Sequence, residues 1–188
     1  MKLIDISVFA SGGGGNFSYL IDNQKDHNIK IKTLVVDKKC GAISIAKKHN
    51  IETILLNNDY IGLFDNESFS SSQIFVLAGF MPIVPKVFLD LLSKRKKKLI
   101  NTHPSLLPKH GGKGMYGVHV QESVLKSKDK IAGCTAHLVN EEIDAGDIIC
   151  QSSIKVEDGI SAWDLGGKIF ALEGPNLIKA IRIADEKF

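Results

Sequence analysis

Asn101 and His103 stand two residues apart in the segment Asn101–Pro108, where an apolar run meets a loop bounded by prolines. Residues i and i+2 of a strand share one face, so this amide and imidazole can point into the same small space. An amide that donates to a developing oxyanion, beside a base that titrates near neutrality, can catalyse acyl transfer to an amine. An isolated pair of this kind is more often a structural strand end, so the interpretation needs support from the rest of the chain.

The glycine-rich turn Ser11–Phe17 is a second chemical signal, because it follows an apolar strand and starts a helix. Bare backbone amides at the positive end of a helix form a cradle for phosphate. A dinucleotide site is an alternative, since Asp37 ends the next strand where a ribose-binding acid would stand. The glycine spacing disfavours it, because Phe17 or Ser18 occupies the place of the last glycine of GxGxxG. The turn therefore predicts phosphate binding, with a purely structural turn as the other alternative.

A third cluster lies downstream, with His137 on an expected strand and Asp144 in a turn marked by Gly146. If Asp144 lies near His103, its carboxylate should favour the protonated imidazole and raise the pKa of His103 above about 6.5. That would equip the imidazole to move a proton. Taken alone, an acidic residue in such a turn is more often a turn former.

The histidines and Asp144 could instead hold a metal ion, and the candidate ligands are His103, His110, His119, His137 and Asp144. The chain has no HExxH motif and no closely spaced His/Cys pair, so we expect no metal. The cysteines are dispersed and form no CxxC motif, which predicts reduced, mostly buried thiols in a cytosolic protein; they are Cys40, Cys134 and Cys150.

Composition fits one globular domain: of 188 residues, 44% are hydrophobic and 24% are charged. The net charge is only +3, and the basic run Lys94–Lys98 follows an amphipathic segment, as at a solvated helix C-terminus. We therefore expect no nucleic-acid partner.

No apolar run approaches the ~20 residues that span a membrane, and Asp5 interrupts any signal-peptide pattern, so a cytoplasmic protein without a membrane partner is expected.

Apolar runs of strand length alternate with segments of helical period, which is typical of an α/β fold with a mostly parallel twisted sheet and helices on both faces. A C-terminal antiparallel hairpin and a long last helix, broken or bent at Gly174–Pro175, complete the expected single domain. The expected strands are Lys2–Ala10, Ile29–Val36, Glu52–Leu56, Ile74–Leu77, Lys98–Thr102, Gly133–Asn140 and Asp147–Lys155. The expected helices are Phe17–Gln24, Ala42–His49, Tyr60–Asn66, Pro85–Lys94, Val118–Lys126 and Ser161–Ala184.

These motifs occur in the order of a known family: a strand with an S-G-x-G-x-N loop, then Leu77–Met81, then Asn101–Pro108, then His137 with Asp144. The chain resembles the phosphoribosylglycinamide formyltransferases, folate-dependent transformylases of purine synthesis with a Rossmann-like fold. The resemblance covers nearly the whole length and is strongest over Val76–Gln151. The motif in Asn101–Pro108 is specific to the formyltransferase superfamily, which strengthens the catalytic interpretation of Asn101 and His103.

The resemblance implies a role for each motif. Residues 1–100 would form the phosphate-binding half of the single domain 1–188, and residues 101–188 the catalytic and folate-binding half. Asn101, His103 and Asp144 match the catalytic trio, with His137 and His119 as further candidates. The ribonucleotide substrate would contact Gly14, Gly15, Asn16 and Glu173. The pterin of 10-formyltetrahydrofolate, the formyl donor, would contact Met81, Pro82, Ile83, Val84, Asn101, Val139, Asn140, Glu141 and Asp144.

The chain departs from the family pattern in several places. Gly15 stands where a serine is usual, and Pro82 replaces a basic residue in the folate wall. The segment Tyr60–Gln73 lacks an arginine that commonly reaches the folate. The glycine-rich loop Lys109–Gly117 predicts either a mobile flap or a plain connector, and Lys113 in it could approach a phosphate.

Three classes of function remain open at this point. The first is formyl transfer to phosphoribosylglycinamide, with two small-molecule substrates and a monomer or a homodimer as the assembly. The second keeps the same centre with another acceptor, namely water, a sugar amine or an aminoacyl-tRNA; relatives that use water or tRNA usually carry a further domain, for which 188 residues leave no room. The third is a non-catalytic nucleotide-binding module.

Overall fold

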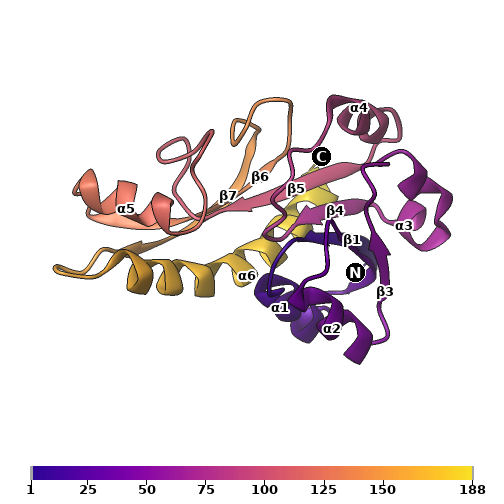
Figure 1. The fold of residues 1–188 in the computed structure, drawn as a ribbon, viewed down its shortest axis with the longest axis horizontal. Helices are drawn as coiled ribbons and strands as arrows, with labels where there is room; N and C mark the ends of the chain where they lie inside the picture. Colours follow the sequence, from indigo (N-terminus) through magenta and orange to yellow (C-terminus); the bar gives the residue numbers. More distant parts are fainter. Residues whose placement is uncertain (1, 188) are drawn as a thin grey trace. The chain divides into compact units, whose positions relative to one another are not determined.

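The chain folds into two compact units, which meet in sequence at the Ile100–Asn101 peptide bond. The computed structural model describes residues 2–187, so Met1 and Phe188, which the predicted domain includes, lie outside the described residues. Figure 1 traces both units along the chain. Strand β5 (Lys98–His103) begins in the N-terminal unit and ends in the C-terminal unit.

The N-terminal unit is built on parallel strands in the order β3-β2-β1-β4-β5. β1 pairs in parallel with β2 and with β4, and β2 pairs in parallel with β3. β1 and β4 are buried along almost their whole length, which explains their near-continuous apolar sequences. The bounds are β1 (Ile4–Ala10), β2 (Ile29–Val36), β3 (Glu52–Leu55) and β4 (Ile74–Leu77).

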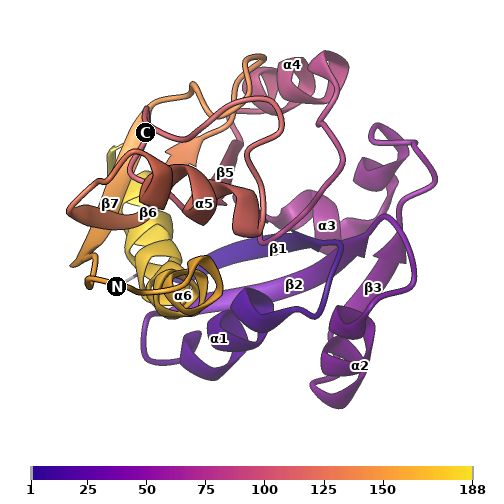
Figure 2. The ribbon, with the colours of Figure 1, turned by 60° about the vertical axis from the view of Figure 1, so that its left-hand side comes forward.

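Helices cover both faces of these strands. α1 and α2 lie on one side, whereas α3 and α4 lie on the other (Figure 2). Right-handed crossovers require this arrangement, because the chain moves outward from β1 to β3 and then returns past β1 to β4. The bounds are α1 (Gly15–Asn23), α2 (Gly41–Lys48), α3 (Glu67–Ser71) and α4 (Lys86–Lys94).

The segment between β3 and β4 differs from the prediction of one helix over Tyr60–Asn66. A 3₁₀ turn spans Gly62–Asp65, and α3 follows it after Asn66, whose side chain accepts a hydrogen bond from the Phe69 amide at 2.9 Å. The fully buried Phe69 ring packs on Phe75, with 4.6 Å between the ring centroids. A capping side chain and one aromatic anchor therefore hold a helix whose serine-rich sequence reads as a loop.

The basic run after α4 is only partly the solvated helix end that we predicted. Lys94 lies in the last turn of α4, as expected. Lys97 instead folds back and donates a hydrogen bond from Nζ to the Ser70 carbonyl at 2.7 Å. Partial burial, together with the nearby charge of Arg95, lowers the pKa of Lys97. Lys97 therefore bonds to a carbonyl in the last turn of α3 instead of extending into water.

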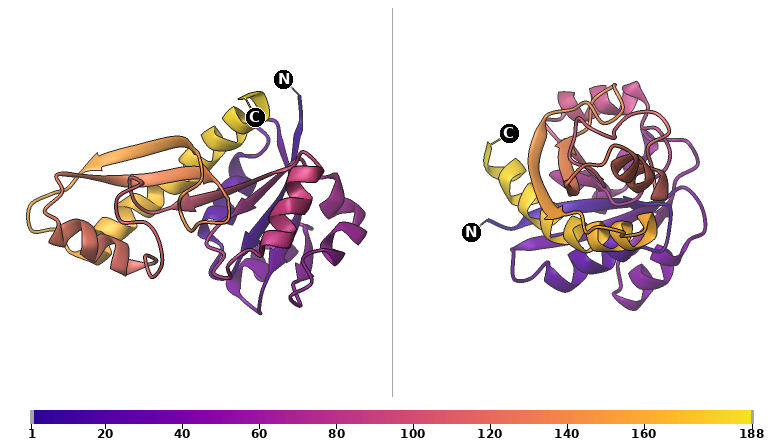
Figure 3. Two further views of the ribbon diagram at one scale, coloured as in Figure 1. Left: turned by 90° about the horizontal axis from the view of Figure 1, so that it is seen from above. Right: turned by 90° about the vertical axis from the view of Figure 1, so that its left-hand side faces the viewer.

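The C-terminal unit joins an antiparallel hairpin to two helices, with strand order β5-β6-β7. α6 packs along β6 and β7, and α5 packs against α6; Figure 3 shows α6 running beside the hairpin. An apolar cluster that includes Val124, Cys134 and Ile169 fills the space between them. The bounds are α5 (Val118–Lys126), β6 (Ile131–Leu138), β7 (Ile148–Lys155) and α6 (Ala162–Lys187).

Helix α6 continues through Pro175, so of the predicted break or bend at Gly174–Pro175 the break is wrong. A proline inside a helix removes one backbone hydrogen bond, and the contacts of the next residue offset that loss. The Asn176 side chain accepts a hydrogen bond from Ser152 Oγ at 2.9 Å, and its amide donates to the Cys150 carbonyl at 3.4 Å. The side-chain bonds of Asn176 to β7 thus hold the helix directly after the proline. Within residues 2–187, no helix is both long and apolar enough to cross a membrane.

Candidate active site

The glycine turn of the N-terminal unit lies where the strand order reverses. In open parallel sheets, ligands bind at the carboxyl ends of the two strands that flank such a reversal, which are β1 and β4 here. Ser11, directly after β1, donates its N–H to the Gly79 carbonyl at 3.1 Å. Its hydroxyl accepts a hydrogen bond from the Met81 N–H at 2.9 Å. The predicted phosphate turn and the start of the predicted folate segment are therefore tied together.

Gly14 is the residue that turns the chain into α1. It is the N-cap of the helix and has a left-handed backbone with φ of 79°. A β-carbon added at Gly14 would lie 2.9 Å from both Cα and Cβ of Ala42 in α2. The first turn of a helix leaves its N–H groups without intrahelical partners, so the start of α1 has the form that an anion site needs.

We expect Gly14→Ala to lower the free energy of unfolding by roughly 2–4 kcal/mol, from left-handed strain and overpacking together. Urea unfolding followed by circular dichroism measures this change. Gly13→Ala is the matched control, because a β-carbon there meets no atom within 4 Å. Equal stability of the two variants would contradict the packing explanation.

The predicted folate segment Met81–Val84 exposes apolar side chains. Met81 is 53% exposed and Ile83 is 76% exposed, whereas Pro82 and Val84 are partly buried. Water contact with such side chains is unfavourable, so a ligand with an apolar ring would be stabilised by covering them.

In the C-terminal unit, four polar side chains from distant parts of the sequence lie in contact. His103 Nδ1 lies 3.3 Å from Asp144 Oδ2, and His137 Nε2 lies 3.6 Å from Asp144 Oδ1. Asn101 Nδ2 lies 3.1 Å from His137 Nε2. The structure thus brings the predicted trio together and adds His137, which was predicted only as a further candidate. We call Asn101, His103, His137 and Asp144 the polar quartet.

Local backbone features place the quartet. Asn101 and His103 both lie on β5, and the pairing of β6 with β7 shifts register between Ala136 and His137. Asp144 has a left-handed backbone with φ of 56°, which aspartate tolerates better than most residues. Its Oδ2 accepts a hydrogen bond from the Gly112 N–H at 3.0 Å. The start of the glycine-rich loop is therefore bonded to the quartet.

Main-chain carbonyls determine which nitrogen of each imidazole carries a proton, because a carbonyl only accepts. His103 Nε2 lies 2.8 Å from the His110 carbonyl, a closer contact than that of Nδ1 with Asp144, so Nε2 carries the proton. His137 Nδ1 likewise donates to the Leu138 carbonyl at 2.9 Å. His137 Nε2 can then accept from the Asn101 amide, which keeps its second N–H for another acceptor.

The pKa of His103 moves in the direction opposite to our prediction. Burial lowers the pKa of His103 below 6.5, and this effect exceeds the upward influence of Asp144 and of the hydrogen bond to His110. The side chain is only 5% exposed, so its charged form loses most of its hydration. Burial therefore favours the neutral form of the imidazole, and the Asp144 carboxylate can stabilise a proton that the imidazole accepts.

Asp144 remains ionised despite its position. Burial raises the pKa of Asp144, but the contact with His137, the charge that His103 carries when protonated and the Gly112 N–H together bring it below 3.8. A carboxylate with these partners can stabilise an imidazolium without taking its proton.

Lowering the pH should destabilise the fold through both His103 and Asp144. Each has a lower pKa in the folded chain than its reference value, so the unfolded chain binds more protons and stability falls as the pH decreases. The imidazole contribution begins to disappear below 6.5 and the carboxyl contribution below 3.8. We expect the free energy of unfolding to fall between about pH 7 and about pH 5 in the wild type, and to fall less in His103→Gln. Identical slopes in urea titrations of the two proteins would contradict this assignment.

The other predicted residues lie in several places. Glu173 is buried in α6 and accepts a hydrogen bond from Thr102 Oγ1 at 3.4 Å. His119 is exposed on α5 and paired with Glu122 at 3.0 Å. Lys113 is exposed. In the loop before Asp144, Val139 is partly buried, and Asn140 and Glu141 are exposed.

Two residues that support the sites were not predicted. Ser11 was part of the glycine turn, but nothing local shows that its hydroxyl accepts from Met81, seventy residues away. His110 was considered only as a metal ligand, whereas its carbonyl contacts His103. Both contacts depend on tertiary structure.

Among the described residues 2–187, no group of three or more His, Cys, Asp or Glu side chains is placed to hold a metal ion.

Two of the three cysteines are buried thiols of low acidity. All three are unpaired, and Cys134 and Cys150 are buried, as predicted. Burial first, and then the charge of Glu173, raises the pKa of Cys134 to about 12. A thiol this weakly acidic is a poor nucleophile.

Comparison with known proteins agrees with these motifs. The chain is 34% identical over 80% of its length to the chloroplastic phosphoribosylglycinamide formyltransferase of Arabidopsis thaliana, and covers 55% of that protein. It is also 34% identical over 95% of its length to the trifunctional purine biosynthetic protein adenosine-3 of Chironomus tentans, and covers 13% of it. The chain thus spans little more than half of one relative and a small part of the other.

A solved structure gives nearly complete coverage. The crystal structure of phosphoribosylglycinamide formyltransferase from Anaplasma phagocytophilum superposes with a TM-score of 0.84 at 31% identity, covering 99% of this chain and 89% of the other. Residues 4–181 match the family described as Formyl transferase. With its fold, its glycine turn and its polar quartet, this chain belongs to the formyl transferase family.

Proposed function

We propose that this protein transfers the formyl group of 10-formyltetrahydrofolate to the amine of 5'-phosphoribosylglycinamide, in the cytoplasm. The observation that carries the proposal is the polar quartet, which supplies an amide donor, a neutral base and a carboxylate around one small space. The names of the relatives support this choice of donor and acceptor. Unpaired cysteines support a reducing compartment.

The reaction begins when the amine nitrogen of the glycinamide attacks the formyl carbon. A carbon–nitrogen bond forms, and the carbonyl electron pair moves to the oxygen. The Asn101 N–H that is not bonded to His137 donates to this oxyanion. The intermediate then collapses, and the bond between the formyl carbon and the folate nitrogen breaks.

One proton must pass from the attacking amine to the departing folate nitrogen. His103 Nδ1 is the nitrogen without a proton in the resting site, so we assign it the role of acceptor, with water as the carrier. Asp144, 3.3 Å away, stabilises the imidazolium until the proton is returned. No net proton is gained or lost by the protein.

The substrate assignments in the N-terminal unit follow from local chemistry. The phosphate of the ribonucleotide is assigned to the turn at Gly14, Gly15 and Asn16, where backbone amides begin α1. The pterin is assigned to Met81–Val84 and to the loop Val139–Asp144. Glu173 is assigned to the glycinamide end.

A direct assay tests this function. The purified protein is incubated with 10-formyltetrahydrofolate and 5'-phosphoribosylglycinamide, and tetrahydrofolate and the formylated ribonucleotide are measured by absorbance and mass spectrometry. We expect both products in equal amounts. Parallel reactions without an amine, or with an amino sugar or an aminoacyl-tRNA, identify another acceptor. Tetrahydrofolate release that does not depend on the ribonucleotide would contradict the proposal.

A further inference from the structure

His110 links the glycine-rich loop to the polar quartet through its main chain. Its backbone is left-handed, with φ of 56°. Its carbonyl accepts the hydrogen bond from His103 Nε2 at 2.8 Å. A left-handed backbone is unfavourable for a residue with a side chain, so this conformation requires contacts that hold it.

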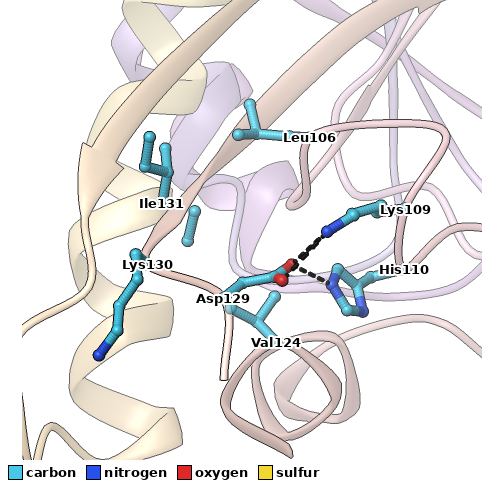
Figure 4. Close-up of a pocket in the computed structure, with 8 residues that line it drawn as sticks. Leu106, Lys109, His110, Val124, Asp129, Lys130 and Ile131 are labelled. Atoms are coloured by element: carbon cyan, nitrogen blue, oxygen red, sulfur yellow. Dashed lines mark hydrogen bonds and ion pairs between the residues drawn. The ribbon is translucent and has the colours of Figure 1, made fainter. Parts of the chain in front are cut away.

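The side chain of His110 supplies those contacts. Its Nε2 lies 3.0 Å from Asp129 Oδ2, and its Nδ1 lies 2.8 Å from Ser123 Oγ in α5. The ring is only 9% exposed. Figure 4 shows the His110 ring and the Lys109 amine converging on the Asp129 carboxylate. The hydrogen bond from His110, followed by that from Lys109, lowers the pKa of Asp129.

These two hydrogen bonds hold the ring of His110 in one orientation. The ionised Asp129 only accepts, so His110 Nε2 carries a proton, and Nδ1 can accept from the Ser123 hydroxyl. Next along the chain, the Gly112 N–H donates a hydrogen bond to Asp144 Oδ2 at 3.0 Å, so the main chain after His110 is also held by a bond. The carbonyl that faces His103 is therefore held from both sides.

We propose that His110 is a positioning residue for the formyl transfer proposed above, on which this inference rests. Anchored by Ser123 and Asp129, it holds its carbonyl against His103 and keeps the proton of that imidazole on Nε2. Without this carbonyl, Asp144 would attract the proton to Nδ1, because a carboxylate is the stronger acceptor. The imidazole would then present Nε2 as the base, in a direction away from Asp144.

A neighbouring cavity makes the proposal testable by chemical rescue. It has a volume of about 420 Å³, and the His110 ring forms part of its wall with Leu106, Val124 and Asp129. Because the cavity opens to solvent, truncating His110 to alanine leaves a hole that dissolved imidazole can enter. Bound there, imidazole could bond again to Ser123 and Asp129.

The first experiment compares His110→Ala and His110→Phe with the wild type. We expect kcat to fall about tenfold in both variants, because small displacements of a catalytic group are costly, while KM changes by less than about twofold. Imidazole in the buffer should restore much of kcat in His110→Ala but not in His110→Phe, where the ring space stays filled. Lys109→Met is the matched control, since it removes an exposed partner of Asp129 and leaves both anchors of His110; its kcat should equal that of the wild type.

The second experiment does not depend on activity. Nitrogen-15 NMR of the histidine rings reports which nitrogen of His103 carries the proton. We expect an Nε2–H signal in the wild type and a shift toward Nδ1–H in both His110 variants. If the wild type transfers no formyl group, the proposed function fails, and this measurement still decides the role of His110.

Two results would overturn the role of His110. One is an unchanged His103 tautomer in both variants. The other is a loss of kcat that imidazole does not restore in His110→Ala. If His110→Ala does not fold, Asp129→Leu removes one anchor without touching the loop, and an unchanged tautomer in that variant counts against the proposal.

Discussion

Replacing Asn101 by alanine is expected to reduce the turnover number for formyl transfer by about two to three orders of magnitude, equivalent to about 2.7–4 kcal/mol of barrier. The amide is the neutral donor of the polar quartet, and its contact with His137 at 3.1 Å fixes the direction of its N–H groups. Its bond to the oxygen is strongest when that oxygen carries charge, so kcat should fall much more than KM rises.

Steady-state kinetics with both substrates varied measures this effect. Asn23→Ala is a suitable control, because that amide donates only to the Tyr19 carbonyl within α1. A turnover number within a few-fold of the wild type in Asn101→Ala would remove the oxyanion role from this residue.

His103→Ala should lose two orders of magnitude or more in turnover, because general acid–base groups contribute about 10²–10⁴-fold. The loss has two parts in this site. The variant lacks the base at Nδ1, and it leaves the Asp144 carboxylate without its closest imidazole, 3.3 Å away. Part of the defect should therefore be relieved in His103→Ala/Asp144→Ala relative to the sum of the single variants.

Single-turnover kinetics distinguishes this chemical defect from weak binding. With both substrates saturating, the formyl-transfer step itself should be slow in His103→Ala, while the dissociation constants change little. The exposed His27 provides a control, and His27→Ala should behave as the wild type. Near-normal transfer by His103→Ala would remove His103 from the mechanism.

Regular elements with continuous patterns were predictable from the sequence. β2 and β4 and helix α5 have the predicted bounds, because apolar runs and helical periods determine which face is buried. The pairing of Asn101 with His103 was also predictable, since both lie on one strand, whereas the resemblance to the formyltransferases implied that Asp144 joins them. Spacing along a strand is a local property, so sequence suffices for it.

The features that were predicted wrongly, or not predicted, share a physical cause. Each of them depends on contacts with residues elsewhere in the fold. Helix α3 is held by Phe69 in the core, and α6 passes Pro175 because Asn176 is bonded to β7. The pKa of His103 depends on how completely the ring is buried, which a sequence does not state. The positions of Ser11 and His110 likewise depend on partners that only the folded chain provides.

The left-handed backbone at His110 and at Asp144 limits which sequences can carry this arrangement. In a saturation library selected for growth or binding, β-branched residues should vanish at both positions even where their volume would fit. Asparagine and glycine should survive longest in measures of folding. The residues that can replace His110 and Asp144 during evolution are then limited by the backbone torsion angle as well as by side-chain chemistry. We expect only a few residue types at these two positions.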